Sequence, residues 1–322
     1  MRTITSTQRA QIRALLMAAA AFCACSAFVY CPAYSELTPA DQLEMEMTLT
    51  TPRCRIQAFE PLVLDINIRN VSDAEARLRG PVCTWGPHFR VHISPAEGEA
   101  YKYEFPRFGQ LCGPPSPPVP LGPQSVFAYR QILLRCADGP ETYAFALPGE
   151  YKVGVRYEPR TGAVFEAAPL VVTVVEPEGR EAEALELWKQ GKFWFLGVTR
   201  PRPERERLRT EYGDTVYGQY ARFLLAHHQA IRRPESKPEG WTESEYLRYP
   251  FAESARRLLA LLQDAPDFPL ADQCMLDLAS AYRYSHRRQE AVAVLGELLQ
   301  DFPTSPTIPE AQALLDQLES AE

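Results

Sequence analysis

The sequence predicts a multidomain α+β protein in which an antiparallel β-sandwich is followed by an array of helical repeats. Apolar residues alternate with period two between about residues 43 and 175, and from about residue 180 their spacing becomes helical. A motif of the second half also returns 37 residues later. We therefore expect an export signal over 1–33, a sandwich over 42–177 and helical repeats over 181–322.

The first segment has the features of an export signal. Three arginines precede an apolar run over 14–30, and small residues follow it. Cleavage after Ser26 and after Ala33 both fit, and a run of about 17 residues is at the lower limit for spanning a bilayer. An uncleaved anchor is therefore an alternative, and residues 22–25 fit a lipid-attachment site poorly. We expect an exported chain, periplasmic or extracellular, whose membrane contact is limited to an uncleaved signal or a lipid anchor.

Export changes how the eight cysteines are interpreted, because disulfides persist outside the cytoplasm. Four cysteines fall within the predicted sandwich: Cys54, Cys83, Cys112 and Cys136. They allow three pairings into two disulfides. We favour 83–112 with 54–136, because each bridge would join neighbouring loops.

A metal site is the competing interpretation of two of these cysteines, with ligands Cys83, His88, His92 and Cys112. However, Phe89, Val91 and Ile93 form the apolar side of a strand pattern, which turns the two histidines toward solvent. We therefore predict no metal site.

Strands with one apolar face make up the predicted sandwich. In residues 62–70 four aliphatic side chains alternate with Asp65, Asn67 and Arg69. The other expected strands cover 44–50, 89–93, 125–134, 151–157 and 170–175. A segment rich in proline, 106–123, is expected to be a crossover loop.

This half resembles the immunoglobulin-like or fibronectin-like modules of exported bacterial proteins. The resemblance rests on residues 59–73 and 147–157 and covers about 130 residues. It implies a spacer, an adhesive module or a binding surface.

The repeat is the most specific signal in the sequence. Leu261-Leu-Gln-Asp-Ala-Pro-Asp-Phe-Pro-Leu-Ala returns as Leu298-Leu-Gln-Asp-Phe-Pro-Thr-Ser-Pro-Thr-Ile, and a fainter copy starts at Leu208. A loop insertion over 232–244 separates the fainter copy from the others. Self-similarity of this size indicates stacked helical hairpins.

The unit resembles a tetratricopeptide repeat of the type found in bacterial envelope-assembly proteins, over about 205–320. Met275 replaces the usual tryptophan, and Leu298 replaces a small residue. The positions that match the family pattern are Leu278, Ala279, Tyr282, Ala291, Leu295 and Pro303.

The resemblance implies a curved array whose inner face binds a protein or peptide. Packing of this face against the sandwich or against a terminal helix is an equally weighted alternative. Residues 181–195 are predicted to begin as an amphipathic helix whose aromatic end packs between the two parts, and 199–207 are predicted to be a charged linker. The candidate inner-face residues are Tyr220, Phe223, His227, Gln273, Leu276, Ser280 and Arg283.

The sequence contains none of the common catalytic or nucleotide-binding motifs, and we predict neither an enzyme nor a cofactor. Its 34 basic and 41 acidic residues argue against nucleic-acid binding by phosphate neutralisation. We expect a noncatalytic protein–protein interaction or scaffold protein of the bacterial cell envelope. The alternatives are an extracellular adhesive or proteinase-inhibitor-like protein that acts through the sandwich, and an enzyme with an unrecognised site.

Overall fold

The computed structural model describes residues 44–78, 89–103, 119–134, 143–158, 164–191, 202–227 and 236–320. Residues 40–322 belong to one compact unit. The predicted export signal lies outside the described residues. Among the helices described, none has the length and apolar character needed to cross a membrane.

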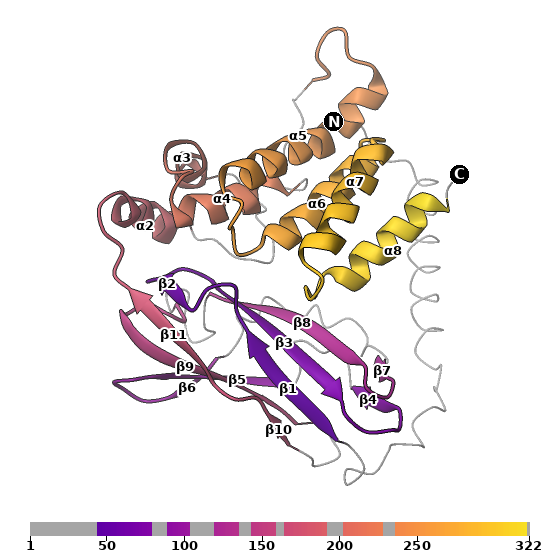
Figure 1. The fold of residues 1–322 in the computed structure, drawn as a ribbon. Coiled ribbons are helices and arrows are strands. Elements are labelled where there is room, and N and C mark those ends of the chain that lie inside the picture. The colour runs from indigo at the N-terminus through magenta and orange to yellow at the C-terminus, as the bar shows by residue number, and fades with distance from the viewer. Residues whose placement is uncertain are drawn as a thin grey trace, which may run out of the picture. The chain divides into compact units, whose positions relative to one another are not determined.

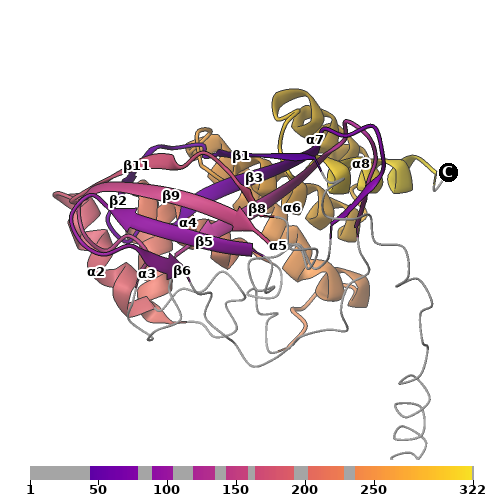
Figure 2. The ribbon, with the colours of Figure 1, turned by 90° about the horizontal axis from the view of Figure 1, so that it is seen from below.

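Two facing sheets form the first half of the described chain (Figures 1 and 2). The smaller sheet has the order β1-β3-β8 and the larger has the order β2-β11-β9-β5-β6, with β10 paired to β9. A separate ribbon joins β4 (Ala76–Leu78) to β7 (Val119–Leu121). The strands of the smaller sheet are β1 (Met45–Thr50), β3 (Leu62–Asn70) and β8 (Val126–Leu133). Those of the larger sheet are β2 (Arg55–Gln57), β5 (Phe89–Pro95), β6 (Tyr101–Tyr103), β9 (Gly149–Tyr157), β10 (Phe165–Glu166) and β11 (Leu170–Val175).

The predicted alternation explains the sandwich core. Leu64, Ile66 and Ile68 of β3 are buried together with residues of the larger sheet, such as Val153 and Tyr157. All six predicted strands are confirmed, with ends shifted by at most a few residues. The described strand pairs are antiparallel as predicted, except at one edge, where β2 runs parallel to β11. The chain passes directly from β1 in one sheet to β2 in the other, so β2 adds to an edge of the second sheet.

Seven described helices follow the sandwich, and the first of them begins at the predicted boundary. Their bounds are α2 (Arg180–Gly191), α3 (Pro203–Glu211), α4 (Val216–Ala226), α5 (Glu243–Asp264), α6 (Ala271–Tyr284), α7 (Arg288–Asp301) and α8 (Ile308–Glu319). Each helix from α2 to α7 contacts the next one along the chain. Figure 1 shows them as a layer beside the sandwich.

The charged-linker prediction for 199–207 is wrong for its second half, because α3 starts at Pro203. Proline at the first helical position is compatible with a helix start. The Arg207–Glu211 pair, 3.1 Å apart, then connects successive turns. Arg205 is buried and donates a hydrogen bond from Nε to the carbonyl oxygen of Gly191 at 2.7 Å.

The two clear copies of the repeat fold in the same way. In each, a helix ends, six residues follow, and the next helix begins, from α5 to α6 and from α7 to α8. The amide of Ala265 donates to the carbonyl of Leu261 at 2.9 Å, and that of Phe302 donates to the carbonyl of Leu298 at 3.0 Å. The sequence repeat is therefore also a repeat of backbone hydrogen bonding.

The fainter copy shares part of this pattern. The amide of Tyr212 donates to the carbonyl of Leu208 at 3.2 Å, and the amide of Thr215 donates to the carbonyl of Tyr212 at 3.0 Å. Two positions are fully buried in all three copies, one at the end of a helix and one in the next helix. These residues are Leu208, Leu261 and Leu298 at the first position, and Ala221, Cys274 and Ala311 at the second.

Candidate interaction sites of the helical layer

The structure distributes the seven candidate inner-face residues between core and surface. Tyr220 and Leu276 are buried, so their assignment to an open binding face is corrected. The hydroxyl of Tyr220 donates to the carbonyl of Pro61 in the sandwich half at 3.2 Å, and its ring meets Phe268 edge-on. The helical core also contains Val63 and Leu134 of the sandwich half. The chain itself therefore covers this part of the predicted surface.

The other five residues are more accessible than Tyr220 and Leu276. Phe223 is half-buried against Phe268, with ring centroids 5.7 Å apart. Gln273 donates to Asp277 at 3.0 Å. Ser280 is half-buried, and His227 and Arg283 are exposed.

A largely buried ion cluster joins the sandwich to the helices. Arg130 of β8 contacts Asp65 of β3 at 2.7 Å and Asp272 of α6 at 2.6 Å. The hydroxyl of Ser305 also donates to Asp272. Burial alone would lower the pKa of Arg130, but hydrogen bonds to the two carboxylates outweigh burial and raise it. The cluster thus fixes α6 against the sandwich with charge-assisted bonds.

A second buried acid lies at the same junction. Glu60 is 2% exposed, accepts a hydrogen bond from the amide of Gln57 at 2.7 Å, and stands 3.8 Å from Arg53. Burial raises the pKa of Glu60 to about 7, although the bond from Gln57 and the charge of Arg53 oppose this rise. Beside it, the hydroxyl of Tyr217 donates to the carbonyl of Ala58.

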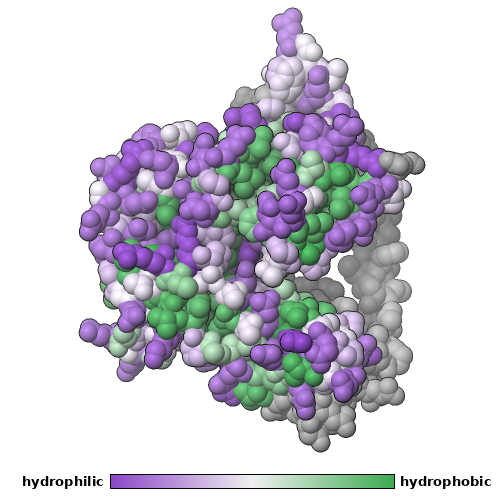
Figure 3. Space-filling model, in the orientation of Figure 1, coloured by the Kyte–Doolittle hydropathy of each residue, from purple (hydrophilic) through white to green (hydrophobic). Residues whose placement is uncertain are grey.

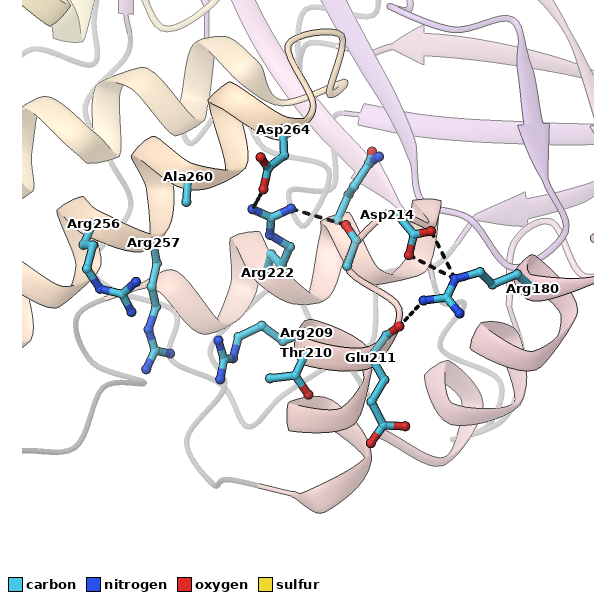
Figure 4. A pocket seen from close by; sticks show the side chains of 12 residues that line it. Arg180, Arg209, Thr210, Glu211, Asp214, Arg222, Arg256, Arg257, Ala260 and Asp264 are labelled. Carbon is cyan, nitrogen blue, oxygen red and sulfur yellow. Dashed lines mark hydrogen bonds and ion pairs between the residues drawn. The ribbon is translucent and has the colours of Figure 1, made fainter.

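The described helices also form a polar groove of about 510 Å³, which we call the arginine groove (Figure 4). This volume lies within the roughly 300–1,000 Å³ of typical ligand sites. Side chains of α2, α3, α4 and α5 line it, with short contributions from the α3–α4 turn. Its lining consists of Arg180, Arg209, Thr210, Glu211, Gly213, Asp214, Gln219, Arg222, Arg256, Arg257, Ala260 and Asp264.

The groove and the sandwich contact lie on different sides of α4. Tyr217 and Tyr220 reach the sandwich half, whereas Gln219 and Arg222 line the groove. Gln219 is two positions after Tyr217, and Arg222 is two positions after Tyr220. Two positions correspond to about 200° around a helix. A groove on this side is therefore accessible while the opposite side is filled.

Acidic groups and carbonyls of the same chain position the groove arginines. Arg222 contacts Asp264 at 2.6 Å and donates to the carbonyl of Gly213 at 3.3 Å. A Cβ atom at Gly213 would stand 2.9 Å from the carbonyl oxygen of Arg209 and 3.2 Å from Cδ of Arg222. Glycine therefore permits the close approach of Arg222 to the α3–α4 turn.

The surface of the helical layer differs between its two ends. In Figure 3 hydrophilic colouring dominates over α2 and α3, and apolar colouring gathers over α5 to α7.

The described residues leave the disulfide prediction untested. Cys54 is exposed with a free thiol, and Cys83, Cys112 and Cys136 lie outside the described residues. Cys274 is buried, as expected for a small apolar side chain, and burial raises the pKa of its thiol.

The structure does not test the competing metal-site interpretation, because three of its four candidate ligands, Cys83, His88 and Cys112, lie outside the described residues. His92 is exposed on β5, as the strand pattern predicts. In the part of the chain that the structure describes, no group of three or more His, Cys, Asp or Glu side chains is arranged to hold a metal ion.

Sequence reasoning missed the arginine groove because its members are far apart in the chain. Arg209, Arg222 and Arg257 come from three helices, and each is an ordinary charged residue in its own segment. The available sequence signal was weak. It is an Arg-Arg pair at 256–257, just before the repeat motif that starts at Leu261. Only the packing of α3, α4 and α5 brings the arginines together.

Comparison with known proteins does not assign the chain to a family. No protein-family model and no curated protein matches it. The β-glucosidase EmGH1 from Erythrobacter marinus is 16% identical over 41% of this chain and 16% of that chain, with a TM-score of 0.26. This chain therefore aligns with about a sixth of that enzyme's length.

Two further structures have similarly low scores. The CARDB domain of the PF1109 protein from Pyrococcus furiosus is 9% identical over 42% of this chain and 97% of that chain, with a TM-score of 0.22. Salmonella alpha-2-macroglobulin reacted with methylamine is 12% identical over 86% of this chain and 26% of that chain, with a TM-score of 0.22. Likenesses at these TM-scores assign neither a family nor an activity.

Proposed function

We propose that this chain is an exported, noncatalytic protein-binding scaffold of a bacterial cell envelope. The observation that carries the proposal is the arginine groove, an open polar surface on the side of α4 opposite the sandwich. A concave polar surface built from several helices suits binding of a protein segment. The helices act as the binding part and the sandwich as their support.

The repeated hydrogen-bond pattern supports a tetratricopeptide-like organisation of the helices. The α5–α6 and α7–α8 connections repeat at the same spacing, and in the fainter copy at α3–α4 the residue after the helix makes the same hydrogen bond to the carbonyl four residues earlier. In stacked repeats each hairpin covers the apolar face of its neighbour. The shared core from α2 to α8 is consistent with such stacking.

Site-specific photo-crosslinking in the native cells tests the proposal. A photoreactive residue at Thr210 would stand in the arginine groove, and one at Lys152 would stand on an exposed position of β9. We expect specific protein adducts from position 210 and none from position 152. Adducts from position 152 alone would instead favour the alternative in which the sandwich makes the main contact.

A further inference from the structure

We propose that the arginine groove binds an acidic, unphosphorylated protein segment through its side-chain carboxylates. This inference rests on the proposed function and adds the chemistry of the partner. Five guanidinium groups line the groove, whereas the chain as a whole carries a net charge of −7. Three carboxylates also line the groove, so its lining carries five positive and three negative charges, and this local positive excess on an acidic protein attracts anionic partners.

The α5 end of the groove carries positive charge beyond that of its own ion pairs. Arg256 and Arg257 both contact one carboxylate, that of Glu253, at 2.7 Å. Hydrogen bonds from Arg256, opposed by partial burial and reinforced by Arg257, lower the pKa of Glu253 to about 2. One anion thus balances two cations at this end, and a partner carboxylate would complete the pairing.

Donor capacity remains in this part of the groove. Arg209 contacts Glu206 through Nε at 2.8 Å, and within the described residues its two terminal nitrogens have no protein partner. Arg256 uses Nε and Nη2 on Glu253, and its side chain is 66% exposed. Planar guanidinium groups bind carboxylates through paired N–H donors. These two arginines can therefore each donate hydrogen bonds to a carboxylate of the partner.

Carboxylates interspersed along the groove favour a protein segment over a nucleic acid. Glu211, Asp214 and Asp264 line the same groove as the arginines. A continuous phosphate backbone would meet these three anions, whereas a flexible peptide can direct its carboxylates to the arginines alone. The groove volume of about 510 Å³ accommodates a few side chains of such a segment.

Fluorescence anisotropy with the full chain tests the inference. The probe is a fluorescein-labelled twelve-residue peptide of alternating Glu and Ser, and the matched peptide carries Gln in place of Glu. We expect the Glu peptide to bind, the Gln peptide to bind at least about tenfold more weakly, and the affinity to fall as salt rises. Equal binding of the two peptides, or no binding of the Glu peptide, would overturn the inference.

Matched variants locate the binding. The double variant Arg209→Gln/Arg256→Gln removes two groove cations, and Arg77→Gln/Arg90→Gln removes two half-exposed cations of the sandwich. We expect at least about tenfold weaker binding for the groove variant and less than about twofold for the sandwich variant, with circular dichroism showing both folded. Equal losses in the two variants would show nonspecific attraction and overturn the inference.

Two further outcomes separate the inference from the functional proposal. Displacement of the Glu peptide by millimolar inorganic phosphate at constant ionic strength would indicate a phosphate site and overturn the carboxylate assignment. If position 210 still forms protein adducts in cells while the Glu peptide does not bind, the scaffold proposal stands and only the partner chemistry is wrong. Loss of the adducts together with intact peptide binding would contradict the scaffold proposal instead.

Discussion

Replacement of Glu60 by glutamine should stabilise the protein at alkaline pH and leave it almost unchanged near pH 4.5. The carboxylate lies at the junction of sandwich and helices, where its side chain is 2% exposed. Burial raises its pKa from 4.5 to about 7. Glutamine keeps an acceptor for the amide of Gln57 and removes the buried charge.

The sign and the size follow from proton linkage. Between pH 4.5 and 7 the folded chain retains a proton on Glu60 that the unfolded chain has lost, so the free energy of unfolding falls as pH rises through this window. A shift of about 2.5 pH units at 1.36 kcal/mol each corresponds to about 3 kcal/mol. The attraction of Arg53 at 3.8 Å is already part of this shifted pKa, so the expected gain at pH 8 is about 3 kcal/mol.

Urea denaturation at pH 5, 6, 7 and 8 measures this difference. The matched control is Glu75→Gln, since Glu75 is about half-exposed and pairs with Arg77 at 3.2 Å. We expect the stability difference between Glu60→Gln and the wild type to grow with pH and then level off, while the control shows no such growth. The reasoning fails if the difference is independent of pH or if the variant is the less stable protein at pH 8.

Three other outcomes test the junction, the helix packing and the cysteines. Arg130→Ala should lower the free energy of unfolding by about 3–5 kcal/mol in urea, because it leaves two carboxylates without their buried cation; a loss below 1 kcal/mol would contradict this. Gly218→Ala should lower the free energy of unfolding by more than about 3 kcal/mol, because the added Cβ would stand 1.7 Å from the carbonyl oxygen of Tyr212. In the control Gly296→Ala the added Cβ has no atom within 4 Å, so this change should be neutral or stabilising. Thiol titration of the denatured, exported chain should find, among residues 36–322, one free thiol, that of Cys274, if the two predicted disulfides form, and five there would refute them.

The strands and most helices could be predicted because their signals are local. In β3 the alternation of apolar and polar side chains fixes which face is buried, and Leu64 and Ile66 are indeed fully buried. The helical hairpins were visible because the same short sequence recurs at the same structural position, from the end of α5 to α6 and from the end of α7 to α8. Local chemistry and global fold agree at these positions.

The junction and the groove could not be predicted, because their contacts join distant parts of the chain. Arg130 and Asp272 are 142 positions apart, and nothing in either segment marks the other as its partner. Tyr220 was assigned to the inner face by its position in the repeat, but that position cannot distinguish a free face from one covered by another part of the chain. The start of α3 was missed for a different reason, since its dense charges resemble a linker until the burial of Arg205 is known.

The repeat yields one prediction that neither sequence nor structure gives separately. Asp277 occupies the position at which the neighbouring copies carry Leu224 and Leu314, both at least 92% buried. Burial raises the pKa of Asp277 from 3.8 to about 6, with the hydrogen bond from Gln273 opposing and the charge of Glu310 adding to the rise. Stability should therefore fall as pH rises from about 4 to about 6. Asp277→Leu should remove this dependence and gain about 2 kcal/mol more at pH 8 than at pH 4 in urea denaturation, because leucine cannot ionise. Asp316→Leu, at an exposed position of α8, is the matched control and should gain nothing comparable. A pH-independent effect of Asp277→Leu, or a loss of stability at pH 8, would show that the aspartate is held by favourable contacts and that the copies are not equivalent at this position.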